Sequence, residues 1–282
     1  MRPYKKVIII GAPRSGTNIL RDVLCSFEKV STWPCDEINY IWRYGNAKFE
    51  SDELIPSMIN GKISRYIYNQ FDWVAKKYNA DFVIEKTCAN SLRVPFVNNL
   101  FPQSKFIFIE RNPLDAISSI IDRWKGSINF NYLFKKAKFV PIGDIPYYSF
   151  KYSKNILDKY FSDNKQFNHW GPKINNFKEF YKNKSLEEVC SIQWLRCTFL
   201  SIDSLSLINN SRIFKIKYES LVRSPQYEIS KILNFLDVAF NEESLNLACN
   251  KINSKSINKG KKNLVNEQVY KINNIIEKYK KF

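Results

Sequence analysis

The chain has 282 residues, of which 44% are hydrophobic and 15% aromatic, a composition that supports a substantial core and excludes disorder as the main state. Its 44 Lys and Arg residues outnumber 27 Asp and Glu residues, and the net charge of +17 favours anionic ligands: nucleotides, sulfated or phosphorylated substrates, nucleic acid or an acidic membrane surface. No apolar run approaches the ~18 residues of a membrane span, and the six cysteines include no CxxC pair. We therefore expect a cytoplasmic protein with reduced thiols and no transmembrane segment.

Four short apolar runs predict strands, because each is followed by a polar or glycine-containing turn and then by helical periodicity. These strands are Lys6–Ile10, Asp81–Glu85, Lys105–Glu110 and Arg212–Lys217. The predicted helices are Asn18–Phe27, Ile63–Tyr78, Ser91–Leu100, Leu114–Trp124, Leu186–Leu207, Gln226–Leu236 and Glu267–Lys280. Strands that alternate with helices indicate βαβ units. They predict an α/β three-layer sandwich whose central parallel sheet binds ligands at the carboxyl ends of its strands.

The stretch 126–184 differs from the rest of the chain in composition. It is rich in Phe, Tyr, Lys and Asn and contains scattered prolines and glycines. We expect it to be an insertion of short helices and loops within a single domain that spans 1–282. Such an insertion either shapes a substrate pocket or serves as scaffold.

A glycine-containing turn follows the first predicted strand, in the segment VIIIGAPRSGTN at residues 7–18. Glycines let successive backbone N–H groups point inward, and the following helix N-terminus adds partial positive charge, so an anion fits there. Gly11 and Gly16 have the Walker A spacing, which makes the fold P-loop-like, but Thr17 stands where the Walker lysine belongs. The cation comes earlier, as Arg14. The loop is therefore predicted to hold one phosphate; an ordinary glycine turn is the alternative for this motif alone.

A second anion seat is predicted in the segment FIFIERNPLDAISSI, where a buried strand ends at Arg111. Pro113 opens the next helix, and Ser119, eight residues after Arg111, lies on its second turn. Taken alone, Arg111 could be an ion-pair partner and Ser119 a surface hydroxyl. Two such motifs, each at a strand's carboxyl end, are far harder to explain by accident than either one alone.

Together these motifs resemble the family of sulfotransferases that use 3′-phosphoadenylyl sulfate (PAPS), especially its bacterial and tyrosylprotein-type members. Further segments match in family order: Glu85-Lys86-Thr87, Lys217–Leu221 with Pro225, and a basic loop at Lys259–Lys262. Asn18 departs from the usual Thr or Ser after the loop. The resemblance implies that the donor is bound by Pro13, Arg14, Ser15, Gly16, Thr17, Asn18, Arg111, Ser119, Tyr218, Lys259 and Lys261.

The implied reaction moves a sulfuryl group from PAPS to an acceptor hydroxyl or amine without a metal, leaving 3′,5′-PAP. Fixed cations can stabilise the leaving phosphate; Arg14 is the first candidate and Lys86 the second, unless Lys86 is scaffold. A hydroxyl acceptor also needs a base. The tyrosylprotein branch uses a glutamate some twenty residues after the loop, so Glu37 is favoured and Asp36 comes second, unless either only caps a helix. The single histidine, His169, is expected to be a pocket or structural residue.

Two other functions fit parts of the sequence. A P-loop kinase or NTPase is disfavoured by the missing Walker lysine and the lack of a convincing Walker B carboxylate pair. A basic nucleic-acid-binding module is disfavoured because no RRM, KH, zinc-finger or helix-turn-helix signature is found, so we expect no nucleic-acid partner. The acceptor stays open among saccharides, lipids, small molecules and peptide tyrosine, and the expected state is a monomer or homodimer.

Overall fold

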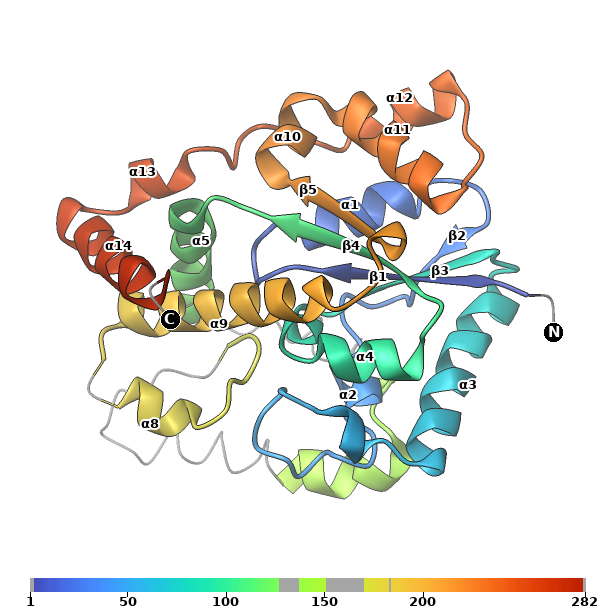
Figure 1. The fold of residues 1–282 in the computed structure, drawn as a ribbon, viewed down its shortest axis with the longest axis horizontal. Coiled ribbons are helices and arrows are strands. Elements are labelled where there is room, and N and C mark those ends of the chain that lie inside the picture. Colours follow the sequence, from blue (N-terminus) through green and yellow to red (C-terminus); the bar gives the residue numbers. More distant parts are fainter. Residues whose placement is uncertain (1–2, 127–136, 151–169, 183, 281–282) are drawn as a thin grey trace.

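Five parallel strands form one sheet, in the order β2-β3-β1-β4-β5, in a computed structural model that describes residues 3–126, 137–150, 170–182 and 184–280 (Figure 1). The strands are β1 (Lys5–Ile10), β2 (Val30–Ser31), β3 (Phe82–Lys86), β4 (Lys105–Glu110) and β5 (Ile213–Lys217). In the central strand, Ile8 pairs with Glu85 on one side and Phe106 on the other. Because all strands run the same way, their carboxyl ends meet at one edge of the sheet.

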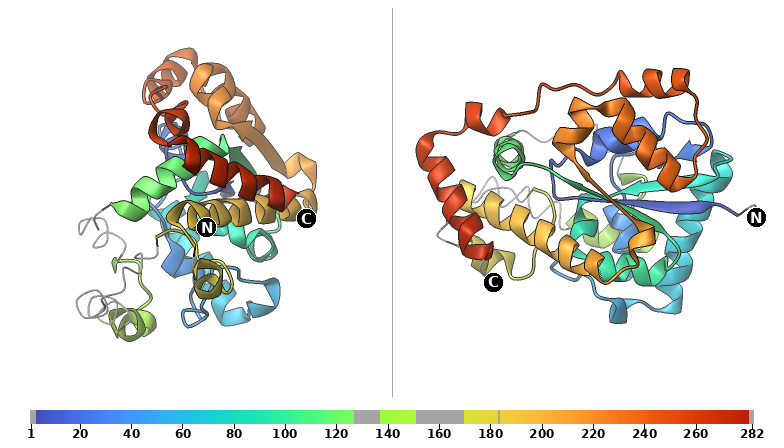
Figure 2. Two further views of the ribbon diagram at one scale, coloured as in Figure 1. Left: turned by 90° about the vertical axis from the view of Figure 1, so that its left-hand side faces the viewer. Right: turned by 45° about the horizontal axis from the view of Figure 1, so that its top comes forward.

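Helices cover both faces of the sheet, as Figures 1 and 2 show. Successive strand residues point to opposite faces: Val7 and Ile9 enter one hydrophobic core, whereas Ile8 and Ile10 enter the other. The first face is covered by α1 (Thr17–Leu24), α10 (Tyr218–Arg223), α11 (Pro225–Leu236) and α12 (Glu242–Cys249). The second is covered by α2 (Asn39–Trp42), α3 (Gly61–Lys77) and α4 (Val94–Leu100).

A third hydrophobic cluster lies beyond the carboxyl edge of the sheet, where α5 and α9 pack together and α14 packs on α9. Its helices are α5 (Pro113–Lys125), α9 (Leu186–Ser206) and α14 (Asn266–Lys280). The smaller helices are α8 (Phe177–Tyr181), α13 (Lys259–Asn263) and the 3-10 turns η1 (Pro56–Met58), η2 (Cys88–Leu92), η3 (Ile142–Asp144) and η4 (Asn210–Arg212). Within the described ranges, no helix is both long and apolar enough to cross a membrane.

The predicted fold class is confirmed: helices flank a central parallel sheet in a P-loop-like arrangement. The predicted helix Ser91–Leu100 is wrong in its first part, because η2 occupies Cys88–Leu92 and α4 begins only at Val94, after Arg93, whose φ of −143° and ψ of 33° are not helical. The expected basic loop at Lys259–Lys262 is instead part of helix α13. Within that helix, Gly260 packs so closely on α5 that an added Cβ would lie 2.6 Å from the Leu114 carbonyl.

Candidate active site

The turn between β1 and α1 is shaped by two residues with left-handed backbone. Arg14 has φ 66° and Gly16 has φ 92°. The Leu20 N–H donates to the Gly16 carbonyl, so the backbone N–H groups that precede it at the start of α1 have no acceptor within the helix. Pro13, Ser15 and Thr17 are buried, and Asn18 is exposed. The turn therefore presents backbone donors and the positive end of a helix, as an anion site requires.

The second motif meets this turn directly. The Nη1 atom of Arg111 donates to the Arg14 carbonyl at 2.8 Å, and Nε of Arg14 donates to the Ser119 hydroxyl at 2.9 Å. The guanidinium of Arg111 also lies 4.5 Å from the centre of the Tyr218 ring, which in turn packs against Gly16. The structure thus places both predicted anion seats next to each other at the carboxyl edge of the sheet.

The burial and the hydrogen bonds of Arg111 are those expected of an anion-binding residue. The residue is only 8% exposed, and its Nη2 atom donates to the Ser256 carbonyl at 2.5 Å. Its Nε is buried and has no hydrogen-bond partner among the described residues. Burial lowers the pKa of the nearby Arg14, and the positive charges of Arg123 and Arg111 lower it further. A phosphate bound between these cations would supply the missing acceptor and relieve their repulsion.

Asp115 anchors the C-terminal segment at the carboxyl edge of the sheet. Its carboxylate accepts the backbone N–H of Asn258 at 2.9 Å and that of Gly260 at 2.7 Å. Lys259 and Lys261 are the two lysines predicted to bind the donor. Lys259 forms an ion pair at 2.9 Å with Asp122, which lies on α5 away from the N-terminus of that helix. Lys261 is exposed. The part of this segment that reaches Arg111 is the Ser256 carbonyl, a backbone contact for which the sequence contains no signal.

Glu37 and Lys86 meet beside the donor turn. The Lys86 Nζ lies 3.0 Å from Oε1 of Glu37 and 3.3 Å from Oδ1 of Asp36, and the Cys88 backbone N–H donates to the same Glu37 oxygen at 3.2 Å. The Cys88 thiol lies 3.8 Å from the Thr17 hydroxyl at the start of α1. This contact brings the predicted base and second cation to the predicted phosphate loop.

Charges within this cluster compensate one another. Burial alone would lower the pKa of Lys86, but Glu37, Cys88 and Asp36 raise it above its ordinary value, so the side chain stays an ammonium. Burial would likewise raise the pKa of Asp36, but Lys86 and Arg21 lower it below its ordinary value. These two cations therefore hold Asp36 as a carboxylate. The remaining candidate, His169, lies outside the described residues.

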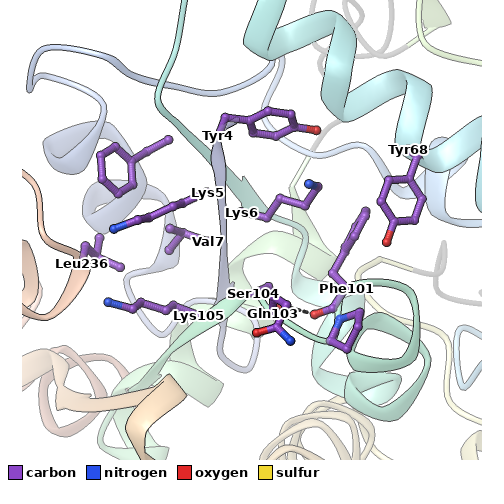
Figure 3. A pocket seen from close by; sticks show the side chains of 12 residues that line it. Tyr4, Lys5, Lys6, Val7, Tyr68, Phe101, Gln103, Ser104, Lys105 and Leu236 are labelled. Carbon is purple, nitrogen blue, oxygen red and sulfur yellow. Dashed lines mark hydrogen bonds between the residues drawn. The ribbon is translucent and has the colours of Figure 1, made fainter. Parts of the chain in front are cut away.

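The opposite, amino edge of the sheet contains a cavity of about 390 Å³ (Figure 3). Its lysines have partners: Lys5 and Lys105 pair with Asp237 at 3.0 and 3.1 Å, and Lys6 lies 4.1 Å from the centre of the Tyr4 ring. Across the parts of the chain that the structure describes, no three His, Cys, Asp or Glu side chains form a group that could hold a metal ion.

Comparison with known proteins identifies the family. A family model described as Sulfotransferase domain matches residues 4–282, so the chain belongs to this family. A Caenorhabditis briggsae protein provisionally named a protein-tyrosine sulfotransferase is 21% identical over 257 residues, which cover 86% of this chain and 69% of that protein. The enzyme's activity is PAPS-dependent transfer of a sulfuryl group to an acceptor. This activity is neither that of a P-loop kinase nor that of a nucleic-acid-binding module, the two alternatives considered from the sequence.

Two solved structures share the fold. The sulfotransferase domain from the curacin biosynthetic pathway has a TM-score of 0.54 and 15% identity, and the alignment covers 99% of both chains. Sulfotransferase STF9 from Mycobacterium avium has a TM-score of 0.55 and 10% identity, covering 99% of this chain and 76% of that one. At these identities the likeness shows a common architecture, and the residue roles come from the contacts described above.

We predict that Gly16→Ala damages the donor turn. Its φ of 92° is strained for any side chain, and an added Cβ would lie 2.3 Å from the Tyr218 ring. We expect about 1–3 kcal/mol less unfolding free energy and weaker PAP binding, measured by thermal unfolding with and without PAP. Gly61→Ala is the control, because an added methyl there meets no atom within 4 Å. Equal melting temperatures for Gly16→Ala and the wild type would contradict this account of the turn.

Proposed function

We propose that this sulfotransferase sulfates a hydroxyl group, with Glu37 as the base and Arg14 and Lys86 as the cations that stabilise the leaving phosphate, without a metal. The main support is the contact of Glu37 with Lys86 at 3.0 Å, close to a donor turn whose own cation is Arg14. Glu37 can take up the acceptor proton as the acceptor attacks, while Lys86 and Arg14 stabilise the negative charge that develops on the leaving phosphate.

PAPS supplies a sulfuryl group bonded to a phosphate oxygen that can leave. In the proposed step, a bond forms between sulfur and the acceptor oxygen, and the bond between sulfur and the bridging oxygen breaks with its electron pair on that oxygen. The acceptor proton passes to Glu37. Arg111 and Ser119 hold the second phosphate of the donor, and the turn of residues 13–18 holds the first, so the protein acts mainly by orientation and fixed charge.

A hydroxyl acceptor fits this site better than an amine. At neutral pH a free aliphatic amine is an ammonium ion, and the cluster of Arg14, Arg111 and Lys86 would repel it. A neutral hydroxyl meets no such repulsion and needs the base that Glu37 provides. Tyrosine in an acidic peptide is the first acceptor to test, because the chain carries a net charge of +17 and the C. briggsae relative is provisionally named a protein-tyrosine sulfotransferase.

The wider context is also proposed. The match of the family model to residues 4–282 supports one sulfotransferase domain over 1–282, with the described parts of 126–184 on the acceptor side. The six cysteines, all in described parts of the chain, form no disulfide, which supports a cytoplasmic location, since disulfides are typical of oxidising compartments. We propose a monomer or homodimer whose small-molecule partners are PAPS, PAP and the acceptor.

The acceptor class is tested with PAPS labelled at sulfur, an acidic peptide that contains tyrosine, and a matched peptide with phenylalanine in its place. We expect label in the tyrosine peptide alone and no change when EDTA is added. A saccharide and glucosamine form two further arms. Label found only on the amine of glucosamine, or activity lost in EDTA and restored by a divalent cation, would contradict the proposal.

A further inference from the structure

The segment that carries Glu37 is anchored immediately behind this residue by buried polar side chains. The Ile38 backbone N–H donates to the Thr87 hydroxyl at 3.1 Å, and the Thr87 hydroxyl donates to Oε1 of Glu85 at 2.5 Å. The Asn90 side chain donates to the other Glu85 oxygen at 2.6 Å. The residue after Glu37 is therefore connected to β3 and η2 through side chains as well as through packing.

A second anchor follows at the next residue. The Nη2 atom of Arg93 donates to the Asn39 side chain at 2.6 Å, and Nε of Arg93 donates to the Asn90 side chain at 2.8 Å. Arg93 and Asn90 are fully buried, and Glu85 is 1% exposed. Two consecutive residues after Glu37 are thus anchored by groups that water does not reach.

The orientation of the Thr87 hydroxyl is set by its surroundings. A threonine hydroxyl has one proton, and that proton is directed to Glu85, so a lone pair faces the Ile38 N–H. Burial raises the pKa of Glu85 to about 7. A buried acid of this kind is costly to ionise, so packing alone does not explain its place beside the base-bearing segment.

The residues on either side of Thr87 in the chain contact the proposed base directly. Lys86 and Cys88, its two chain neighbours, both donate to Oε1 of Glu37. Thr87 thus fixes the backbone of the residue that follows Glu37, while Lys86 and Cys88 hold the Glu37 carboxylate. Displacing a catalytic group by about 1 Å can cost roughly 100-fold in rate, so loss of the Thr87 hydroxyl is expected to slow turnover.

We propose that Thr87, oriented by Glu85, is a positioning residue for Glu37: its hydroxyl holds the Ile38 N–H and so fixes the base relative to the donor turn. This inference rests on the proposed role of Glu37. Thr87 is not proposed to touch either substrate, so its loss should change turnover and leave donor binding intact.

The test is a double-mutant cycle between Thr87→Val and Glu37→Gln. Valine keeps the volume of threonine and removes the hydroxyl. We measure PAP binding by calorimetry and the release of labelled sulfate from PAPS with water as acceptor, so that no acceptor needs to be known. We expect Thr87→Val to lower kcat by ~10-fold or more, to leave the PAP Kd within ~2-fold, and to have no further effect in the Glu37→Gln background.

Two controls separate positioning from stability. Thr87→Ser keeps the hydroxyl and should restore turnover to within ~3-fold of the wild type. Ser104→Ala removes another buried hydroxyl, bonded to the Phe101 carbonyl at the amino edge of the sheet (Figure 3), and should leave kcat unchanged. If Thr87→Val does not fold, Thr87→Ala enters the same cycle.

Three results would overturn the inference. They are an unchanged kcat in Thr87→Val, an equal loss in Thr87→Ser, or a full additional loss on top of Glu37→Gln, which would indicate a general structural effect. Failure of the proposed function looks different: Glu37→Gln itself would then retain full turnover. A wild-type protein that binds PAP, together with an inactive Glu37→Gln and a fully active Thr87→Val, would refute the positioning role alone.

Discussion

Arg111→Ala is expected to lower the affinity for PAP by at least ~100-fold, about 2.7 kcal/mol, because it removes a buried guanidinium whose Nε still needs an acceptor. The change also releases the Arg14 carbonyl and the Ser256 carbonyl, so the donor turn and the C-terminal segment lose a common partner. Calorimetry with PAP measures the affinity, and ATP with magnesium serves as the competing nucleotide, which we expect to bind poorly to the wild type.

Arg212→Ala is the matched control for this prediction. Arg212 is partly buried, donates to the Ser104 carbonyl at 3.0 Å and to the Asn98 side chain at 2.8 Å, and precedes β5 at the amino edge of the sheet. It should cost stability without changing PAP affinity. Arg111→Lys keeps the charge and loses the forked geometry, so an intermediate affinity is expected. Equal PAP affinities for Arg111→Ala and Arg212→Ala would show that the second anion seat is wrongly placed.

Glu37→Gln is expected to lower kcat by ~100- to 10,000-fold and to leave PAP affinity within ~3-fold of the wild type. The substitution keeps the shape of the side chain and removes its capacity to take up a proton. The contacts described for Glu37 run to Lys86 and Cys88, whereas the donor seats are built from Arg14, Arg111 and Ser119. Turnover of labelled PAPS and calorimetry with PAP measure the two quantities separately.

Asp36→Asn is the control for this second prediction. Asp36 accepts from Arg21 at 2.9 Å and from Lys86 at 3.3 Å, and these cations lower its pKa, so its loss should affect the placement of Lys86 more than proton transfer. We expect a smaller loss of kcat than for Glu37→Gln. The reverse order, with Asp36→Asn inactive and Glu37→Gln active, would move the role of base to Asp36.

The sequence by itself determined four of the five strands, their direction and the positions of the two predicted anion-binding turns; the two-residue strand β2 (Val30–Ser31) was not predicted. A turn such as Gly11–Thr17 needs residues that tolerate left-handed backbone, and a buried parallel strand needs a continuous apolar run, so both leave local signals. The pitch of a helix predicts that Arg111 and Ser119 face one side, and in the structure both contact Arg14: Arg111 donates to its carbonyl and Ser119 accepts from its Nε. Parallel strands then bring both turns to one edge without further information.

Only the tertiary structure decided which groups actually touch. Ser256 reaches Arg111 through a backbone carbonyl, Asp115 holds Gly260, and Thr87 holds Ile38, in each case across a long stretch of chain. Such contacts depend on how closely helices pack on the sheet, as at Gly260, and backbone donors and acceptors are the same in every residue. Local sequence patterns report backbone preference and burial; the choice of a distant hydrogen-bond partner is made by packing, which is why these positions had no signal in the sequence.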